Sequence, residues 1–194
     1  MGRISFTEEI RGITTDTDGF VHGENYHFYM PSTRQSPQLY QQLLSTANSC
    51  IDIWDPYFTK EAAHVFDLVQ NKDGLHINIL TRQSIDKTRK DFDEFIDEVK
   101  NILKRNKNIN THYHGYFYTK KKFDTIWHDR YLIIDKEYVY LVGTSIDEQI
   151  NPVKSFGIHQ IEKETDKKLI CNIYDNCKSC LISAGPNRNG YIRT

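Results

Sequence analysis

The stretch that decides the fold reads Trp127-His128-Asp129-Arg130-Tyr131-Leu132-Ile133-Ile134-Asp135. Its pattern predicts a β-strand over residues 126–134. Because side chains alternate along a strand, we expect His128 and Arg130 on the same face. A guanidinium offers a fork to two phosphate oxygens, and an imidazole beside it can attack phosphorus or shuttle a proton. The stretch therefore predicts a phosphate-binding centre.

A second segment, Gly143-Thr144-Ser145-Ile146-Asp147, follows another predicted strand over residues 138–142. Ser145 lies in the turn after that strand, where its hydroxyl could donate a further hydrogen bond to a phosphate. Asp135 could orient a partner from the far end of the strand that carries the histidine. The predicted catalytic residues are His128, Arg130, Asp135 and Ser145.

The rest of the chain reads as alternating strands and helices, then mostly strands. Alternation in the first half favours a largely parallel sheet with flanking helices, and the second half favours antiparallel additions. We expect one mixed α/β domain over residues 1–180 and a loose tail over 181–194. The predicted strands are 26–30, 50–54, 75–80, 109–116, 126–134, 138–142, 158–161 and 169–174. The predicted helices begin at Ser36 and at Thr59, and a long amphipathic helix covers about 85–104.

Composition describes a soluble globular chain. The 194 residues include 38% hydrophobic and 26% charged residues, with a formal net charge of -1, so any attraction to phosphate must come from local patches. No run of about 18 apolar residues could span a membrane, and the first 20 residues lack the apolar core of a secretory signal. We therefore expect a cytoplasmic protein with reduced thiols.

A basic run supports a phosphate partner. Between Lys100 and Lys122 there are seven Lys or Arg residues and no acidic one. Aromatic residues lie among them, which suits stacking on nucleic acid or contact with a membrane headgroup layer. We assign Lys120, Lys121 and Lys122 to phosphate binding, together with His128, Arg130 and Ser145. The alternative is a solvated helix end and loop, with the aromatics in the core.

The cysteines give a weak metal signal. Cys171, Cys177 and Cys180 lie close in sequence, and His159 is the nearest possible fourth ligand. Structural zinc sites commonly pair two CxxC units, and only one occurs here. We interpret these residues as buried or incidental thiols, and we expect neither a metal nor a cofactor.

The motif residues resemble the HxKxxxxD and GSxN elements of the phospholipase D superfamily. In that superfamily the histidine forms a phosphohistidine and the lysine holds the phosphate. By position, His128 takes the nucleophile place, Arg130 the lysine place and Asp135 the aspartate place. Ser145 and Asp147 stand for the serine and asparagine. The resemblance implies a phospholipase D-like half-fold with one motif copy.

The chain departs from the superfamily pattern in three ways. Arg130 keeps the positive charge of lysine but has a different geometry, and Asp147 adds negative charge near the site. Only His128 is followed two residues later by a cation. Because enzymes of this superfamily need two motif copies, the resemblance implies a homodimer for any active form.

A closer likeness covers about residues 34–178. This region resembles the phospholipase D-like C-terminal domain of MIT-domain proteins that partner ESCRT-III, a domain that binds phospholipid membranes and is regarded as non-catalytic. The first 33 residues are too short for the MIT helical bundle. Some microbial phospholipase D-like proteins serve in defence against phage. The matching elements are Trp54-Asp55-Pro56-Tyr57, Leu80-Thr81, His128-Asp129-Arg130, Gly143, Ser155-Phe156-Gly157 and Ile173-Tyr174.

Two functions follow. The first is a phosphate-recognising module that binds nucleic acid or an anionic phospholipid surface, which allows a peripheral location at the membrane, a larger protein complex and a role in microbial defence. The second is a metal-independent homodimeric phosphodiesterase or nuclease with His128 as nucleophile. A third reading is an interaction domain whose site has lapsed, with the His128 and Arg130 pair satisfied structurally by Asp55 or Asp129.

Overall fold

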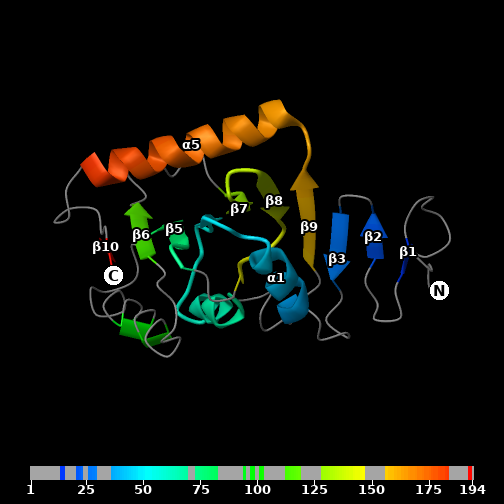
Figure 1. The fold of residues 1–194 in the computed structure, drawn as a ribbon, viewed down its shortest axis with the longest axis horizontal. Helices are drawn as coiled ribbons and strands as arrows, with labels where there is room; N and C mark the ends of the chain where they lie inside the picture. The colour runs from blue at the N-terminus through cyan, green and yellow to red at the C-terminus, as the bar shows by residue number, and fades with distance from the viewer. Residues whose placement is uncertain are drawn as a thin grey trace.

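A ten-stranded sheet forms the centre of the chain in a computed structural model (Figure 1). The structure describes residues 14–15, 21–23, 26–29, 36–69, 73–82, 94, 97–98, 101–102, 112–118, 128–146, 156–183 and 192–193. The strands are β1 (Thr14–Thr15), β2 (Val21–Gly23), β3 (Tyr26–Tyr29), β4 (Cys50–Trp54), β5 (His76–Arg82), β6 (His112–Tyr118), β7 (Arg130–Ile134), β8 (Tyr138–Val142), β9 (Phe156–Ile161) and β10 (Ile192–Arg193). The helices are α1 (Ser36–Ser45), the 3₁₀ helix η2 (Ala62–Leu68) and α5 (Glu164–Ser183).

The sheet mixes parallel and antiparallel pairs, in the order β1-β2-β3-β9-β8-β7-β4-β5-β6-β10. The pairs β4–β5 and β5–β6 are parallel, and the other pairs are antiparallel. The η2 segment lies between β4 and β5 in sequence and provides the crossover that a parallel pair requires. The predicted mixed α/β class is confirmed, with a smaller parallel part than the sequence pattern suggested.

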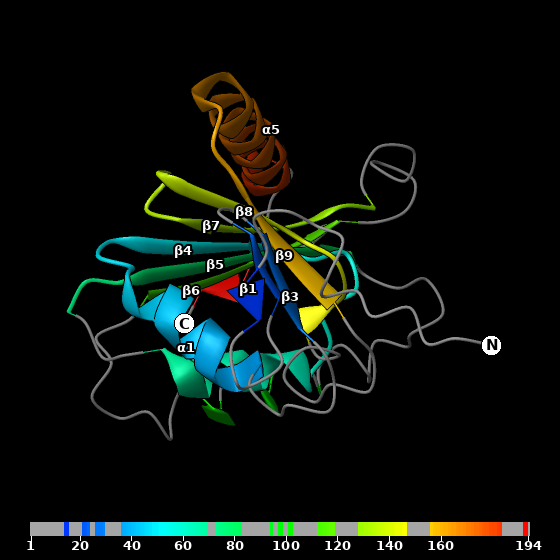
Figure 2. The ribbon, with the colours of Figure 1, turned by 90° about the vertical axis from the view of Figure 1, so that its right-hand side faces the viewer.

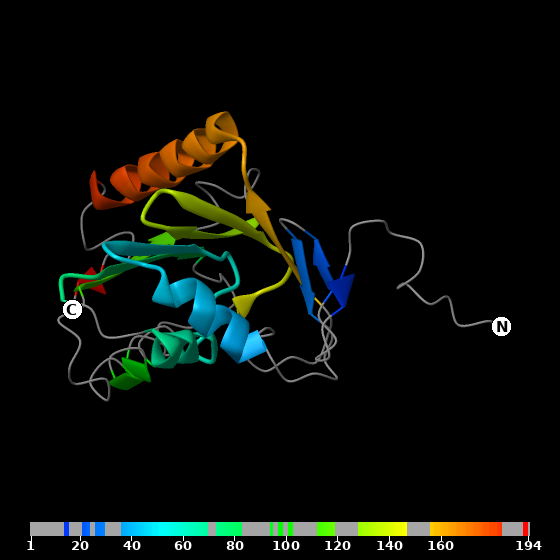
Figure 3. The ribbon, with the colours of Figure 1, turned by 45° about the vertical axis from the view of Figure 1, so that its right-hand side comes forward.

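Helices cover both faces of the sheet (Figures 2 and 3). On one face, α1 and η2 pack on alternate residues of the central strands, including Ile51 and Ile53 of β4. On the other face, α5 packs on Trp54 and its neighbours. The period of two along β4 thus sends its apolar side chains into two separate cores. This three-layer arrangement leaves the ends of the strands available for a site.

The prediction of a strand over residues 169–174 is wrong, because these residues lie inside α5. Cys171, Tyr174 and Cys177 are buried against the sheet, at the three-residue spacing of one helix face. Glu164 and Asp166 lie in the first helical turn, where acidic residues favour the positive end of the helix dipole. A short apolar run cannot by itself distinguish a strand from a buried helix segment.

Several other predicted elements are confirmed. The helix begins at Ser36, and the strands over 50–54 and 138–142 have the predicted bounds. Thr59 accepts a hydrogen bond from the Ala62 N–H at 3.3 Å, although the helix that follows is a 3₁₀ helix. Of the long helix predicted over 85–104, only residues 94, 97–98 and 101–102 are described, and they are helical.

The C-terminal residues also join the fold where they are described. The α5 helix runs to Ser183, beyond the predicted domain boundary at residue 180. Ile192 and Arg193 pair with Gly115 and His114 of β6, so this part of the predicted tail extends the sheet. Among the described residues, no helix is both long and apolar enough to cross a membrane.

Candidate functional site

The ends of three central strands lie side by side at one end of the sheet; this end is called the sheet edge below. The register pairs Trp54, the last residue of β4, with Tyr131, and it pairs Arg130, the first residue of β7, with Val142 at the end of β8. The C-terminal ends of β4 and β8 therefore lie beside the start of β7. This pairing brings the residues after Trp54 and after Val142 to the predicted phosphate centre.

Asp55 is the buried acidic residue of this site. Only 1% of its surface is exposed. Its Oδ1 accepts a hydrogen bond from the Tyr57 N–H at 2.9 Å, and its Oδ2 accepts one from the Ile146 N–H at 3.0 Å. The pKa of Tyr40 is raised well above its usual value. Burial is the larger cause, and the negative charge of Asp55 is the second. Asp55 thus joins the loop after β4 to the loop after β8.

Arg130 is held between Asp55 and Tyr57. Its Nε lies 3.6 Å from Asp55 Oδ1, a distance that fits an ion pair and is too long for a good hydrogen bond. Its Cζ lies 4.9 Å from the centroid of the Tyr57 ring, within the range of a cation–π contact. The Arg130 side chain keeps 22% of its surface exposed. Within the described part of the chain, no acceptor hydrogen-bonds the two terminal nitrogens.

His128 lies at the same edge, and Tyr57 connects it to Arg130. The Tyr57 hydroxyl and His128 Nδ1 are 3.0 Å apart, and the tautomer decides which of them donates. His128 is exposed, and its Nε2 makes no hydrogen bond with a described residue. One tyrosine therefore touches both residues that the sequence placed at the centre.

A glycine allows the loop after β8 to lie close to β9. The Gly143 N–H donates a hydrogen bond to the Gly157 carbonyl oxygen at 2.9 Å. A Cβ at Gly143 would lie 3.0 Å from that oxygen, so a larger residue would push the loop away. Ser145 is buried, with 7% of its surface exposed, and precedes the Ile146 N–H that binds Asp55. The structure thus places Ser145 beside this site.

Asp135 does not belong to this site. It follows the last residue of β7, whereas Arg130 is the first, so the two lie at opposite ends of a five-residue strand. Its Oδ1 accepts hydrogen bonds from the N–H groups of Ser49 and Cys50 at 2.8 Å each, and from the Ser49 hydroxyl at 2.9 Å. Its Oδ2 accepts one from the Asn48 N–H at 2.7 Å. These contacts correct its predicted catalytic role to an anchor between the β7–β8 turn and the start of β4.

Electrostatics agree with this anchoring role. Partial burial alone would raise the pKa of Asp135, but the hydrogen bonds from Cys50, Ser49 and Asn48 outweigh burial and lower the pKa to about 2. The backbone φ angles of Asp135 and Lys136 are 53° and 60°, in the left-handed region where Asp is one of the few tolerated residues. The aspartate therefore fits the turn by conformation and by charge.

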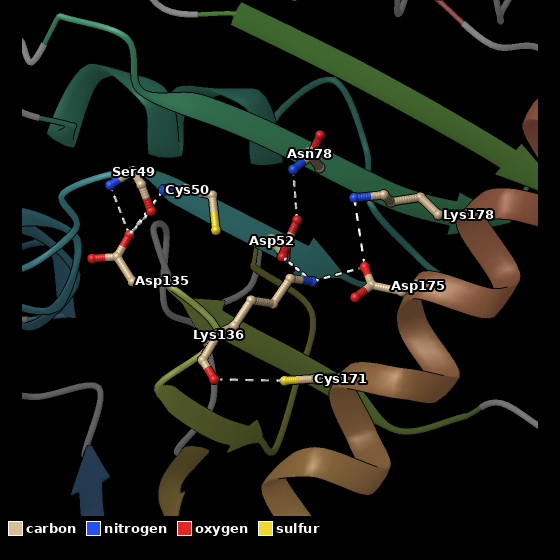
Figure 4. Close-up of polar contacts among 9 residues, drawn as sticks. All are labelled: Ser49, Cys50, Asp52, Asn78, Asp135, Lys136, Cys171, Asp175 and Lys178. Atoms are coloured by element: carbon tan, nitrogen blue, oxygen red, sulfur yellow. Dashed lines mark hydrogen bonds and ion pairs between the residues drawn. The ribbon is translucent and has the colours of Figure 1, made fainter.

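A second polar cluster lies between the sheet and α5 (Figure 4). Asp52 is fully buried and accepts a hydrogen bond from Asn78 Nδ2 at 2.6 Å. Lys136 Nζ lies 2.6 Å from Asp52 and 2.9 Å from Asp175 of α5. Burial alone would lower the pKa of Lys136, but Asp52 and Asp175 outweigh burial and raise the pKa. The contact between Lys136 and Asp175 therefore joins α5 to the sheet, and Lys178 Nζ, on the same helix as Asp175, lies 3.6 Å from that carboxylate.

The cysteines have structural positions. Cys50, Cys171 and Cys177 are free thiols, and burial is the main cause that raises the pKa of Cys50 and Cys171. The side chain of Cys180 lies outside the described residues. Within the described ranges, no group of three or more His, Cys, Asp or Glu side chains could hold a metal ion.

The structure brings two of the predicted site residues together. His128 and Arg130 lie together as predicted. Asp55 and Tyr57 follow a predicted parallel strand at its C-terminal end, where ligand sites in such sheets gather, and Pro56 equally predicts a turn there. The sequence does not show that both residues contact Arg130. Lys120, Lys121, Lys122 and Asp147 lie outside the described residues.

Comparison with known proteins shows the fold. No family model matches the chain, and no curated protein matches. Nuc from Salmonella typhimurium, a phospholipase D family member, aligns with a TM-score of 0.53 and 12% identity over 87% of this chain and 97% of that one. NucT from Helicobacter pylori aligns with a TM-score of 0.52 and 13% identity over 79% and 95%.

The chain therefore has a phospholipase D-like fold. At 12–13% identity the likeness shows the architecture alone, so residue roles must come from the geometry of this chain. The likeness to the MIT-associated domain receives no support from these comparisons.

Proposed function

We propose that the chain binds a phosphodiester group at the sheet edge formed by Asp55, Tyr57, His128 and Arg130. The observation that carries this proposal is the state of the Arg130 guanidinium. Asp55 and Tyr57 hold its inner side, while its terminal nitrogens meet no acceptor among the described residues. A guanidinium fixed in this way presents a preorganised fork to two phosphate oxygens.

His128 adds a second phosphate contact. Its imidazole is exposed, and the Tyr57 hydroxyl engages Nδ1. This contact leaves Nε2 for the ligand. A phosphate oxygen between Nε2 and the Arg130 fork would thus meet polar groups from two residues at the start of β7. Ser145, in the adjoining loop, is proposed as a further donor, and Lys120, Lys121 and Lys122 as contacts to neighbouring phosphates.

Binding is favoured over hydrolysis by the partner of His128. In histidine-based catalytic sites a carboxylate commonly orients the imidazole and stabilises its protonated form. Here the group at Nδ1 is the neutral hydroxyl of Tyr57. The buried carboxylate, Asp55, is instead directed to Arg130 and two backbone N–H groups. The site is therefore better equipped to hold a phosphodiester than to stabilise a charged imidazole during its cleavage.

The phosphodiester could belong to nucleic acid or to an anionic phospholipid. The test measures binding to labelled single- and double-stranded DNA and RNA and to phosphatidylglycerol liposomes. We expect Arg130→Ala to weaken binding by about 10- to 100-fold, because charge-assisted hydrogen bonds are removed. Arg130→Lys should restore part of the affinity, since charge remains without the fork. Lys163→Ala is the matched charge control. Lys163 is exposed and follows the C-terminal end of β9, which lies away from Arg130.

Wild-type affinity in a folded Arg130→Ala variant would disprove this site. Equal losses of affinity in Arg130→Ala and Lys163→Ala would point to nonspecific charge instead. Binding to liposomes alone, or to nucleic acid alone, identifies the source of the phosphodiester. We also propose that the protein acts within a larger complex, such as one that serves microbial defence. Binding to nucleic acid and binding to phospholipid are both compatible with this role.

Hydrolysis is the second candidate, and the orientation of His128 favours it in one respect. With Nδ1 engaged, Nε2 has the freedom that a nucleophile requires. One chain supplies one such histidine, whereas the reaction also needs a group to protonate the leaving oxygen. A twofold dimer would supply that group from a second copy. Any cleavage should therefore occur in a dimer, survive EDTA and disappear in His128→Ala, as gel assays and light scattering would determine.

A further inference from the structure

Thr81 carries a buried hydroxyl group without a hydrogen-bond partner. Only 2% of the residue is exposed, and its Oγ1 makes no hydrogen bond within the described part of the chain. Buried polar groups in folded proteins are nearly always hydrogen-bonded, because an unsatisfied group lowers stability. The hydroxyl therefore contributes no hydrogen bond to the stability of the ligand-free fold.

The strand register places Thr81 next to Asp55. The parallel pairing of β4 with β5 sets Trp54 beside Leu80. The Asp55 N–H donates a hydrogen bond to the Leu80 carbonyl oxygen at 3.1 Å, so the pairing continues one residue beyond β4. Thr81 thus lies level with Asp55 at the C-terminal ends of two parallel strands, where ligand sites in such sheets gather.

Thr81 and Arg130 lie on the same face of the sheet. Ile79 of β5 and Leu132 of β7 both belong to the core beneath α1 and η2. Because side chains alternate along a strand, the residues two positions away, Thr81 and Arg130, point to that face. The buried Nε of Arg130 also makes no hydrogen bond with a described residue. Two unsatisfied groups therefore lie on either side of Asp55, since β4 lies between β7 and β5.

From this arrangement we infer that Thr81 is a specificity-determining residue of the proposed phosphodiester site, where its hydroxyl hydrogen-bonds an oxygen of the organic group esterified to the phosphate. The inference rests on the proposed function and adds the part of the ligand beyond the phosphate. An anionic oxygen is attracted by Arg130 and repelled by the carboxylate of Asp55. A neutral ester or hydroxyl oxygen experiences less of this repulsion. The order of cation, carboxylate and hydroxyl across β7, β4 and β5 thus matches a diester that lies across the three strand ends.

The distance between Arg130 and Thr81 fits such a ligand. Neighbouring strands lie about 4.8 Å apart, so the backbones of these two residues are separated by roughly 10 Å. The arginine side chain covers part of this span, because its Nε reaches to within 3.6 Å of Asp55 Oδ1. A phosphate with the first carbon atoms of a sugar or of glycerol covers the rest. Because Thr81 is buried, the contact requires neighbouring side chains to move, and such rearrangements are common on binding.

The test measures affinity and stability in the same variants. The probes are inorganic phosphate and two phosphodiesters, namely a thymidine dinucleotide and glycerophosphoglycerol, which is phosphatidylglycerol without its acyl chains. Thr81→Val should weaken binding of the diesters by about 3- to 10-fold, because one hydrogen bond is lost, and should leave the affinity for inorganic phosphate unchanged. Thr81→Ser should restore diester binding, since the hydroxyl remains. NMR titration gives these affinities.

Thermal melting distinguishes a role in binding from a role in the fold. The melting temperature of Thr81→Val should equal or exceed that of the wild type, because a methyl group replaces a hydroxyl that has no partner. Thr46→Val is the matched control. Thr46 Oγ1 donates a hydrogen bond to the Leu43 carbonyl oxygen at 2.7 Å, and Thr46 precedes β4, at the end of that strand remote from Asp55. This variant should melt at a lower temperature and bind all three probes like the wild type.

Unchanged diester affinity in Thr81→Val, or an equal loss for inorganic phosphate, would overturn the inference and leave the phosphate site intact. A lower melting temperature or failure to fold in Thr81→Val would also overturn it, because the hydroxyl would then serve the fold. A loss confined to one of the two diesters would support the inference and identify the organic group. Absence of binding to all three probes, or diester binding that Arg130→Ala does not weaken, would instead remove the proposed function, and the inference with it.

Discussion

Asp55 and Arg130 are neighbours across the ends of two antiparallel strands, with Arg130 Nε 3.6 Å from Asp55 Oδ1. The carboxylate is 1% exposed and the arginine side chain 22% exposed. Asp55 therefore carries a buried charge that Arg130 partly compensates from the surface side. This relationship gives the site its shape, because Asp55 also binds the N–H groups of Tyr57 and Ile146.

Removal of the Asp55 carboxylate should therefore reduce both stability and binding. In Asp55→Ala the two N–H groups and Arg130 no longer have their acceptor, and we expect the free energy of unfolding to fall by about 3 kcal/mol. Urea denaturation measures this decrease. Asp67→Ala is the control, since Asp67 is exposed and its ion pair with His64 lies at the surface, and it should change stability by less than about 0.5 kcal/mol. Similar values for the two variants would contradict the role given to Asp55.

The stability of the fold should depend on the ionisation of Asp135. Its pKa in the folded chain is about 2, below the usual 3.8. A lowered folded pKa means that the ionised carboxylate stabilises the fold above about pH 4, and that this contribution disappears as the pH falls towards 2. After allowance for solvent screening, the contribution is about 1–2 kcal/mol.

Asp135→Asn isolates this effect, because asparagine also tolerates the left-handed backbone of the turn. The difference in unfolding free energy between wild type and Asp135→Asn should be largest near pH 7 and should fall to about a third of that value near pH 2.5. Denaturation by urea at a series of pH values gives this difference. A difference that stays constant over this range of pH would show that charge at Asp135 does not anchor the turn.

The two acidic partners of Lys136 should differ in importance. Asp52 is fully buried, whereas the side chain of Asp175 is 48% exposed. Lys136→Met leaves a buried carboxylate without its cation, and we expect stability to fall by about 3 kcal/mol. Asp175→Asn removes a partly solvated charge and should cost less than about 1 kcal/mol. Thermal melts of both variants would rank them, and the reverse order would refute this account of how α5 is held.

The basic residues Lys120, Lys121 and Lys122 are proposed to contact phosphates beside the central one. Changing all three to Glu should weaken polyanion binding at low salt and flatten its salt dependence. On a single strand the logarithmic slope should change by roughly 0.7 for each phosphate that the protein no longer neutralises. Fluorescence anisotropy at several salt concentrations provides both quantities. Unchanged affinity with an unchanged slope would remove these lysines from the binding surface.

Local sequence was sufficient for one part of the site. The two-residue period of a strand predicted that His128 and Arg130 lie close together, and both contact Tyr57. The predicted strand begins only at Arg130, so His128 and Asp129 precede β7 instead of belonging to it. The same reasoning placed β4 and β8 correctly. It failed for residues 169–174. A short and mostly apolar run fits both the helical and the strand periodicity, and only its packing against the sheet distinguishes them.

The motif likeness also proved ambiguous at Asp135. Sequence spacing relates it to His128, but spacing along an extended strand carries it away from that residue, by about 3.3 Å for each position. Only the tertiary structure reveals the N–H groups of residues 48–50 that surround its carboxylate. Its role is therefore decided by a segment distant in sequence.

The sequence by itself predicted the α/β class and the proximity of His128 and Arg130. The tertiary structure decided which groups hold them. Tyr57 and His128 are 71 positions apart in sequence, and Asp55 and Ile146 are 91 positions apart. Such contacts depend on how β4, β7 and β8 pair, and strand pairing is set by the packing of two whole cores on the faces of the sheet rather than by the residues in contact.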